Sequence, residues 1–299
     1  MTGASRTAPS PKKSIVLADD DPMTLEAMAE VLNAEGYAVH TAQDGLEALA
    51  LIRAVKPDYI ILDVVLPKLD GGKICAAVRQ DARLRQTPII AFSGLSPQEY
   101  HFFPQFSADA YVAKGRLPIA AQHLLTALSH FEESVDGGTR ERMKGQLLGY
   151  ENFRSRQLVH DLLQEQRHLR AILRVCPPGA LELDRAGRVI WANPGACEIL
   201  GKTEIELAGE PFVTLVPSHD QRVVQDLLIT LGQSEEPAQV VTTLSLNDRS
   251  VAVWLAPILE DHACTGLFVQ MDRAEGKRFR LEAGCERAES GRAVACRPR

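Results

Sequence analysis

Three aspartates stand where apolar stretches of the chain end or are interrupted. Asp19 and Asp20 follow the run IVLA, and Asp63 lies within IILDVVLP. Carboxylates that crowd together in a poorly solvated place are costly to ionise unless a cation neutralises them. Carboxylate and backbone carbonyl oxygens suit Mg²⁺, an ion that keeps several waters and is often shared with phosphate oxygens. The residue types and their spacing therefore indicate a magnesium site suited to phosphoryl chemistry.

Two more polar residues close apolar runs further along the chain. Ser93 ends IIAFS and Lys114 ends DAYVAK, so a hydroxyl and an ammonium group are expected beside the carboxylates. Taken alone, Ser93 is typical of a turn and Lys114 of a solvated surface charge. The carboxylate cluster favours the functional interpretation, because both groups can bind phosphoryl oxygens. Asp21 is different: an Asp followed by Pro22 is typical of a helix N-terminus, and we assign Asp21 to a helix cap.

The elements that position these residues follow from the alternation of patterns between residues 14 and 131. Short apolar runs, such as residues 60–62 and 89–92, alternate five times with helical stretches. Parallel strands need a crossover helix between them, and a sheet covered on both faces has nearly continuous apolar strands. The pattern predicts an α/β fold with a doubly wound, five-stranded parallel sheet. The carboxyl ends of such strands form the ligand-binding edge, where the polar residues above are expected to meet.

Residues 132–176 are predicted to form a helical linker. Asp136-Gly137-Gly138 ends the preceding helix, and Pro177-Pro178 ends the linker. Between these breaks, apolar residues recur on one seam at helical spacing. The seam consists of Leu148, Leu158, Leu162, Leu169 and Ile172. Polar residues interrupt it, so two interpretations stay open: a solvated connector helix, or a short coiled coil that joins two copies of the chain.

Residues 177–272 carry a different pattern, in which strand pairs flank short helices. Three β-like runs at 238–246, 250–259 and 265–271 are separated by turn residues and predict an antiparallel meander. We expect a small α+β domain with an antiparallel sheet. The polar stretch 1–13 is predicted to be a disordered leader. The basic tail 273–299, rich in Gly, Ala and Arg, is also predicted to be disordered.

Composition argues against several classes of protein. The six cysteines lie far apart with no CxxC pair, which argues against a zinc site and a disulfide framework. The apolar stretches fall far short of the roughly 20 residues of a membrane helix, and no signal-peptide pattern is seen, so a cytoplasmic location without membrane insertion is expected. The net charge is −6 and the positive excess lies in the tail, which argues against nucleic-acid binding.

Residues 14–131 resemble the receiver domain of two-component response regulators. The resemblance is carried by ADDDP, DVVLPKLDG, AFSG and DAYVAK, which hold the acidic pair, the phosphoryl acceptor, the hydroxyl and the lysine of that family. It implies a flavodoxin-like fold in which Asp63 takes a phosphoryl group from a histidine kinase or a phosphotransfer protein. By the same resemblance, Asp19, Asp20 and the carbonyl of Val65 would hold Mg²⁺ together with Asp63.

The resemblance also assigns the remaining site residues. Ser93 and Lys114 would bind the phosphoryl oxygens, and Tyr111 matches an aromatic switch residue that turns inward as the Ser93 hydroxyl moves. Two departures from the family are expected to alter details. Gly115 follows Lys114 where the family usually has a proline, so a trans peptide bond or a loosened loop is predicted there. Pro104 within HFFPQF is predicted to kink or shorten the fourth helix of the domain.

Residues 181–212 resemble the opening of a PAS domain. Asn193 and two turn glycines, Gly201 and Gly209, stand at matching places. Val224 stands where haem-binding members of that family have a histidine, and the NCR-type cysteine motif of flavin-binding members is missing, so a PAS domain without a ligand is expected. Four aromatic residues are assigned to the apolar core in preference to a ligand pocket. They are Trp191, Phe212, Trp254 and Phe268.

These resemblances together imply a response regulator of a two-component phosphorelay. It would be phosphorylated on Asp63 with Mg²⁺ and would signal through the PAS domain to a downstream protein or, by phosphorylation-dependent dimerisation, to a second copy of itself. The receiver would catalyse only its own phosphorylation and dephosphorylation and would not be a metabolic enzyme. Two alternatives stay open: a sensor whose PAS domain binds a small ligand with the receiver as its output, and a fragment of a hybrid histidine kinase.

Overall fold

The computed structural model describes residues 13–95, 107–133, 147–149, 168–175, 178–247, 249–273, 285–287 and 293–296. The chain divides into two compact units, Met1–Leu163 and Gln164–Arg299, each with a sheet of its own. Within the part of the chain that is described, no helix is both long enough and apolar enough to cross a membrane.

The first unit is built around a parallel sheet with the strand order β2-β1-β3-β4-β5-β6. Its elements are β1 (Ser14–Ala18), α1 (Pro22–Ala34), β2 (Ala38–Ala42), α2 (Gly45–Val55), β3 (Tyr59–Leu62), α3 (Gly71–Gln80), β4 (Ile89–Ser93), β5 (Ala110–Ala113), α4 (Leu117–Glu133) and β6 (Leu147–Leu148). The predicted five-stranded parallel sheet is confirmed by β1 to β5. The strand order reverses at β1, so the ligand-binding crevice of this topology lies between the carboxyl ends of β1 and β3.

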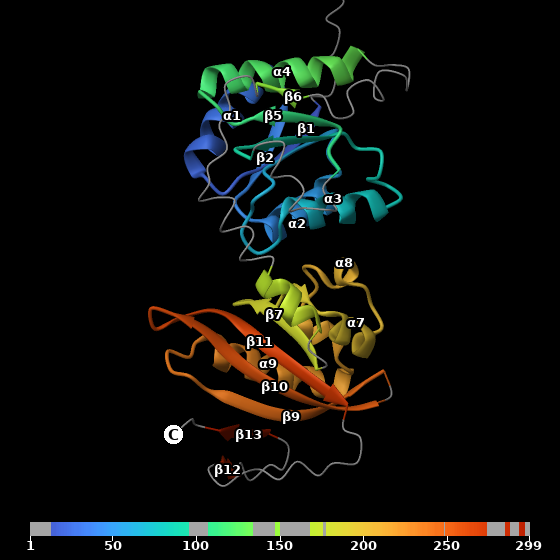
Figure 1. Ribbon diagram of the computed structural model, residues 1–299, viewed down its shortest axis with the longest axis vertical. Coiled ribbons are helices and arrows are strands. Elements are labelled where there is room, and N and C mark those ends of the chain that lie inside the picture. Colours follow the sequence, from blue (N-terminus) through green and yellow to red (C-terminus); the bar gives the residue numbers. More distant parts are fainter. Residues whose placement is uncertain are drawn as a thin grey trace, which may run out of the picture. The chain divides into compact units, whose positions relative to one another are not determined.

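Helices cover both faces of this sheet. Helices α1 and α4 lie on one face, and α2 and α3 lie on the other (Figure 1). The core under the first pair joins Leu25 and Met28 of α1, Leu124 and Leu128 of α4, and strand side chains such as Phe92. Strand side chains alternate between the two faces. Because both faces are buried, the strands have the nearly continuous apolar runs seen in the sequence.

An aspartate caps each of α1, α2 and α3, which begin near the carboxyl ends of the strands. Asp21, Asp44 and Asp70 accept hydrogen bonds from backbone N–H groups in the first turns of α1, α2 and α3. Such a carboxylate satisfies a donor that the helix leaves unpaired and interacts favourably with the positive end of the helix dipole. The predicted role of Asp21 is thereby confirmed, with Pro22 in the first turn.

The linker contributes a strand where the sequence predicted a helix. Leu147 and Leu148 form β6, which pairs in parallel with Tyr111 and Val112 of β5. Leu148 packs against the core of the first unit, and Gly149 follows with a φ of 81°. The helix prediction was wrong here because β5 would otherwise be an edge strand. Its backbone groups and the apolar surface beside it can bind a strand, whatever helical spacing the bound segment carries.

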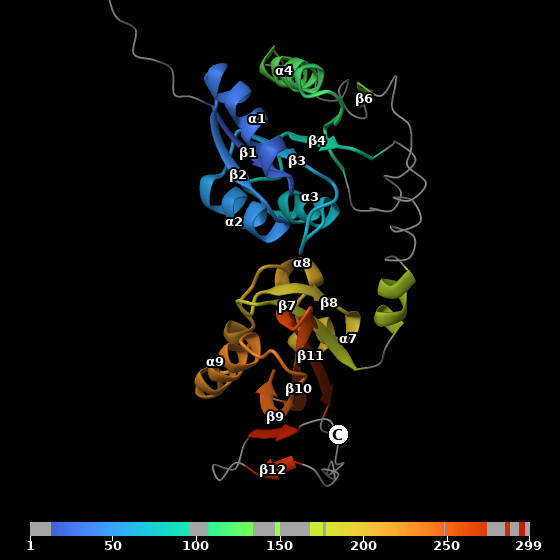
Figure 2. The ribbon, with the colours of Figure 1, turned by 90° about the vertical axis from the view of Figure 1, so that its left-hand side faces the viewer.

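The second unit contains an antiparallel sheet with the strand order β12-β13-β9-β10-β11-β7-β8. Its elements are a helix over residues 168–175, β7 (Gly179–Asp184), β8 (Val189–Ala192), α7 (Pro194–Leu200), α8 (Glu204–Leu207), η2 (Phe212–Leu215), α9 (Ser218–Gly232), β9 (Gln239–Leu246), β10 (Arg249–Glu260), β11 (Ala263–Arg273), β12 (Cys285–Arg287) and β13 (Ala293–Cys296). The predicted α+β domain with a meander is confirmed by β9, β10 and β11, which lie side by side (Figure 2).

The core of the second unit gathers side chains from the sheet and from α7, α8, η2 and α9. Phe212 and Val224 are fully buried, and Trp191 is buried. The predicted core positions of Trp191 and Phe212 are therefore confirmed. Trp254 of β10 and Phe268 of β11 are only partly buried, because alternate side chains of a strand point to opposite faces of the sheet.

Two short strands lie in the tail that the sequence predicted to be disordered. β13 pairs with β9 in antiparallel fashion, and β12 pairs with β13. The prediction was wrong for these strands because composition does not show that the edge of β9 can be extended by a distant segment. Several other predictions fall outside the described residues: the leader before Lys13, the kink at Pro104, and the linker seam at Leu158 and Leu162.

Candidate metal centre

The three candidate carboxylates meet at the carboxyl edge of the parallel sheet. Asp19 follows β1 and Asp63 follows β3, and these strands are neighbours with Ala18 opposite Leu62. The Asp63 N–H donates to the carbonyl of Ala18 at 2.9 Å. Asp19 is fully buried and Asp63 is 6% exposed, whereas Asp20 is exposed. One oxygen from each of the three carboxylates lies within 4.8 Å of the others.

Lys114 supplies a positive charge to both buried carboxylates. Its Nζ lies 2.5 Å from Asp63 Oδ2 and 2.7 Å from Asp19 Oδ2. Lys114 follows β5, and its backbone N–H donates to the carbonyl of Ser93 at 2.9 Å. The ammonium also lies 5.8 Å from the ring centre of Phe92, within the range of a cation–π contact. The structure thus brings Lys114 to the carboxylate cluster that the sequence predicted it would face.

Burial and charge together shift the pKa values of this cluster. Burial raises the pKa of Asp19 above its ordinary 3.8, although Lys114 opposes the shift. For Lys114, burial by itself lowers the pKa, but Asp63 and Asp19 outweigh it and raise the pKa above the ordinary 10.5. Lys114 is therefore a cation at neutral pH. This single positive charge faces three crowded carboxylates, so the cluster still favours a further cation.

The loop after β3 holds the remaining expected ligand. The Val65 N–H donates to Asp63 Oδ1 at 3.3 Å, and the side chain of Val65 is 43% exposed. The Gly71 N–H donates to the carbonyl of Val64 at 2.9 Å, which closes the loop onto the start of α3. The backbone at Val65 is therefore held next to the Asp63 carboxylate.

Ser93 and Tyr111 lie on β4 and β5. Ser93 is buried at the end of β4, where its Oγ accepts a hydrogen bond from the N–H of Leu95 at 3.4 Å. Its bond to the backbone of Lys114 places the two residues at the same edge of the sheet. Tyr111 is half-buried further back on β5 and pairs with Leu147 of β6. Burial raises the pKa of the Tyr111 hydroxyl.

The donor set suits a hard divalent cation. It consists of carboxylate oxygens with a backbone carbonyl nearby, the ligands typical of Mg²⁺, Ca²⁺ and Mn²⁺. Among the described residues, Asp19, Asp20 and Asp63 form the one group of three acidic, His or Cys side chains arranged to hold a metal ion. The residues present therefore fit Mg²⁺.

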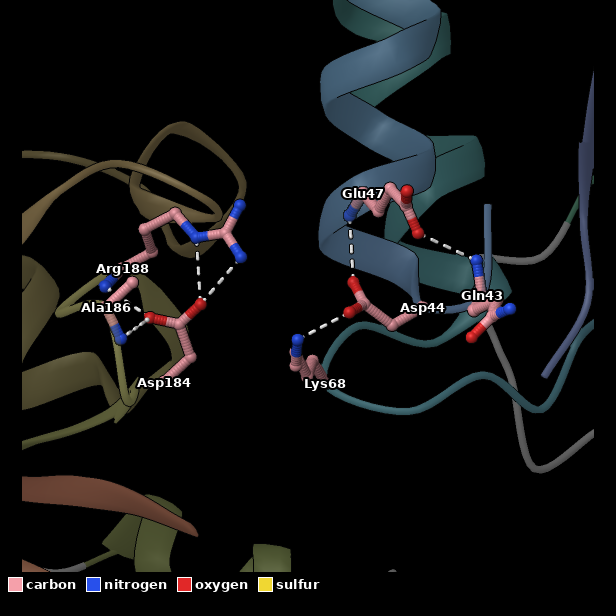
Figure 3. A network of polar contacts seen from close by, with 7 residues as sticks. All are labelled: Gln43, Asp44, Glu47, Lys68, Asp184, Ala186 and Arg188. Atoms are coloured by element: carbon pink, nitrogen blue, oxygen red, sulfur yellow. Dashed lines mark hydrogen bonds and ion pairs between the residues drawn. The ribbon is translucent and has the colours of Figure 1, made fainter. Parts of the chain in front are cut away.

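Sequence reasoning missed two contacts of this region. The run IIAFS predicted a core strand, but not that the ring of Phe92 would lie beneath the Lys114 ammonium. Lys68, in the loop after β3, pairs with Asp44 at the start of α2, with Nζ and Oδ2 2.5 Å apart (Figure 3). Nothing in the sequence signalled that these two residues would pair.

The peptide bond between Lys114 and Gly115 is trans, as are all peptide bonds in the described parts of the chain. This agrees with the predicted consequence of losing the proline, because a cis bond before a residue other than proline costs about 2.5–4 kcal/mol. The loop after β5 therefore begins with ordinary backbone geometry at the residue that carries the ammonium.

The polar network around Asp184 in the second unit is structural. Asp184 Oδ1 accepts hydrogen bonds from the N–H groups of Ala186 and Arg188, at 2.9 and 2.8 Å. Its Oδ2 accepts from the Arg188 guanidinium at 2.8 Å (Figure 3). These bonds satisfy both oxygens of a buried carboxylate and fix the turn between β7 and β8.

Comparison with protein families agrees with the two units. Residues 15–129 match the response regulator receiver domain, and residues 167–272 match the PAS fold. The chain carries a response regulator receiver domain followed by a PAS domain. Receiver domains are signalling domains that typically bind Mg²⁺ at an acidic cluster, which here consists of Asp19, Asp20 and Asp63.

Individual relatives are similar over part of the chain. The polar-differentiation response regulator DivK of Brucella anthropi is 27% identical over 120 residues, which are 40% of this chain and 95% of DivK. The response regulator MprA of a Mycobacterium species is 36% identical over 115 residues, which are 38% of this chain and 48% of MprA, so the match spans about half of that relative. The solved structure of the chemotaxis response regulator CheY4 of Vibrio cholerae is 28% identical, with a TM-score of 0.36, and the match covers 39% of this chain and 98% of CheY4.

Proposed function

We propose that this protein is a response regulator whose receiver domain accepts a phosphoryl group on Asp63 in a Mg²⁺-dependent reaction. The donor would be a phosphohistidine of a histidine kinase or a phosphotransfer protein, as the similarity to response regulators implies. The observation that carries the proposal is the 2.5 Å pairing of the nearly buried Asp63 carboxylate with Lys114, inside a cluster of oxygen ligands. A nucleophile, a fixed cation and a metal-ligand set thus share one edge of the sheet.

Asp63 is the nucleophile in this proposal. One of its oxygens attacks the phosphorus, the bond from phosphorus to the donor imidazole nitrogen breaks, and the electron pair stays on that nitrogen. Mg²⁺, when bound, supplies positive charge to the phosphoryl oxygens and orients them. Lys114 pairs with Asp63 Oδ2 before the reaction. Afterwards its ammonium pairs with a negatively charged oxygen of the transferred phosphoryl group. Ser93 donates a hydrogen bond to another phosphoryl oxygen.

Ser93 and Tyr111 form the switch in this proposal. The backbone bond from Lys114 to Ser93 joins the ends of β5 and β4, and Tyr111 lies on β5 opposite the linker strand β6. A movement of the Ser93 hydroxyl toward the phosphoryl group therefore has a short route, through β5, to a segment of the linker.

We further propose that the PAS domain binds another protein and holds no ligand, and that phosphorylation promotes a homodimer in the cytoplasm. The first point is supported by Val224, which stands where haem-binding PAS domains have a histidine. Its apolar side chain is fully buried in the core. In support of the second, helix 168–175 exposes Leu169 by 56% and Ile172 by 48%, a stripe that a second copy would cover. The proposed limits are 14–131 for the receiver, 132–176 for the linker and 177–272 for the PAS domain.

Incubation of the full chain with radiolabelled acetyl phosphate tests the proposed acceptor. Wild type is expected to take up base-labile label, and Asp63→Asn none, because an amide is a poor nucleophile. Asp58→Asn is a matched control, since Asp58 lies just before β3 and binds the N–H of Ser14 at 2.7 Å. Equal labelling of Asp63→Asn and wild type would overturn the proposal.

Thermal unfolding with and without Mg²⁺ tests the metal. A ligand at one hundred times its Kd stabilises a protein by about 2.7 kcal/mol, so Mg²⁺ should raise the melting temperature of wild type and of Asp58→Asn. Asp20→Asn should lose most of this gain. Because Asp20 is exposed and crowds two other carboxylates, the variant should keep its fold without Mg²⁺. A variant that melts below wild type without Mg²⁺ would contradict this expectation.

A further inference from the structure

The loop over residues 63–71, between β3 and the start of α3, is here called the acceptor loop because it begins at the proposed acceptor Asp63. It contains a tight turn at Lys68. The N–H of Leu69 donates to the carbonyl of Pro67 at 2.7 Å, and Lys68 between them has a φ of 65°. A residue other than glycine seldom adopts a positive φ, and such a turn persists only where surrounding contacts hold it. The contacts that hold this turn therefore control the shape of the loop.

The start of α2 makes two of these contacts. Asp44 Oδ2 pairs with Lys68 Nζ at 2.5 Å (Figure 3), and the N–H of Gly45 donates to the Pro67 carbonyl at 3.0 Å. Asp44 is itself fixed, because its other carboxylate oxygen accepts the N–H of Glu47 at 2.8 Å. The turn is thus tied by a charged contact and a backbone contact to a capped, rigid helix end.

Gly45 allows this close approach. A Cβ at this position would lie 1.8 Å from the Leu69 carbonyl oxygen and 2.6 Å from its carbonyl carbon. Both are backbone atoms, so no side-chain movement could relieve the clash. Gly45 and Leu69 are both buried. The backbone of α2 therefore rests directly on the backbone of the acceptor loop.

The same loop carries two of the proposed metal ligands. Asp63 begins it, and the N–H of Val65 donates to the Asp63 carboxylate at 3.3 Å. The Gly71 N–H donates to the Val64 carbonyl at 2.9 Å, which ties the two ends of the loop together. Val65 also stands only a few residues before the turn at Lys68. A shift of the turn is expected to move the backbone at Val65.

We propose that Asp44, Gly45 and Lys68, here called the α2 clamp, are positioning residues that hold the acceptor loop in the geometry in which Asp63 and the Val65 carbonyl bind Mg²⁺. This inference rests on the proposed function. A clamp that serves stability alone would change the melting temperature without changing metal affinity, because exposed ion pairs contribute little beyond their immediate surroundings. Metal affinity therefore separates the two roles.

The test compares variants of the full chain by calorimetric titration with Mg²⁺ alone and then with beryllofluoride in the presence of Mg²⁺. Asp44→Asn keeps a good helix cap and removes the charge that Lys68 binds. Lys68→Met removes the ammonium and leaves a residue that adopts a positive φ only where contacts hold it. Each variant should bind Mg²⁺ roughly 10-fold more weakly, the low end of the effect of outer-shell partners on metal affinity. The double variant should lose no more than either single variant, because both break one contact.

Glu132→Gln is the matched control. It breaks the ion pair of Glu132 with Lys13, which lie 3.0 Å apart and are more exposed than Asp44 and Lys68. Lys13 precedes β1, at the amino end of the strands, so Mg²⁺ affinity should stay within twofold of wild type. Unchanged affinity in Asp44→Asn and Lys68→Met, or additive losses in the double variant, would overturn the clamp and leave the proposed function standing. A wild type that binds no Mg²⁺ would overturn both.

Discussion

Lys114 Nζ lies 2.5 Å from Asp63 Oδ2. The same ammonium lies 2.7 Å from Asp19 Oδ2, so the lysine pairs with one oxygen of each buried carboxylate. Asp19 and Asp63 also belong to the group of carboxylates that can hold a metal ion. The lysine and a divalent cation would therefore share these carboxylates, and this links the stability of the receiver domain to its affinity for metal.

Lys114→Met is expected to lower stability and to strengthen Mg²⁺ binding. Without the ammonium, two buried carboxylates lose their cationic partner, which should cost about 1–3 kcal/mol in the absence of metal. Mg²⁺ then no longer shares the oxygens with a lysine, so its Kd should fall. Urea unfolding and calorimetric titration measure the two effects. Lys13→Met, which removes an exposed pair with Glu132, is the control, and weaker Mg²⁺ binding by Lys114→Met would contradict the argument.

The pair of Asp44 and Lys68 predicts an acid dependence of stability. Burial by itself raises the pKa of Asp44, but hydrogen bonds from Lys68 and from the N–H of Glu47 outweigh it and hold the pKa below the ordinary 3.8. A lowered carboxyl pKa contributes stability that is present above the unfolded-state pKa and is lost as pH falls through the folded-state pKa. Asp44→Asn should therefore be less stable than wild type at neutral pH, by at most about 1 kcal/mol because Lys68 is partly exposed.

Urea unfolding of both proteins over a series of pH values measures this dependence. The difference in unfolding free energy should stay constant down to about pH 5 and shrink as the pH falls below about 4. A difference that is independent of pH down to the acid limit of folding would show that the charge of Asp44 contributes nothing.

Leu148→Asp is expected to detach β6 from β5. Leu148 is half-buried against the receiver core, and a charge there should cost about 1–2 kcal/mol of receiver stability. Backbone amides at the β5 edge should then exchange faster with solvent. Leu169→Asp is the matched control, because Leu169 is 56% exposed and should change stability by less than about 0.5 kcal/mol. Equal effects of the two substitutions would contradict a docked β6.

Asn193→Ala is expected to destabilise the PAS domain strongly. The Asn193 Oδ1 accepts the N–H groups of Ala180 and Ala196, each at 2.8 Å, and its Nδ2 donates to the carbonyls of Pro178 at 2.9 Å and Leu173 at 3.3 Å. Loss of the side chain leaves buried backbone groups unpaired and removes the cap of α7, which should cost about 2–4 kcal/mol.

Fluorescence of the two tryptophans, which both lie in the second unit, reports this unfolding. Asn193→Asp keeps the acceptor for the cap and loses the two donor bonds, so it should fall between wild type and Asn193→Ala. If Asn193→Asp were as unstable as Asn193→Ala, the cap would contribute little and the donor bonds to the carbonyls of Leu173 and Pro178 would dominate.

Local and periodic signals in the sequence were sufficient to predict the core of the fold and most of the candidate site. Strands that are buried on both faces are apolar throughout, so the alternation over residues 14–131 predicted five parallel strands. The start of α1 depends on Asp21 and its neighbour Pro22, which stand side by side in the chain. Asp19 and Asp63 were predicted to meet because neighbouring parallel strands end at the same edge of a sheet.

Contacts between distant segments were decided only by the tertiary structure. Leu148 has helical spacing but forms a strand on β5, and Ala293–Cys296 lies in a basic tail but extends β9. Lys68 pairs with Asp44, which belongs to a different crossover of the sheet. Each of these contacts depends on a strand edge or a charged partner that only folding brings near. The periodicity and composition of a segment describe its own preferences and carry no information about such a neighbour.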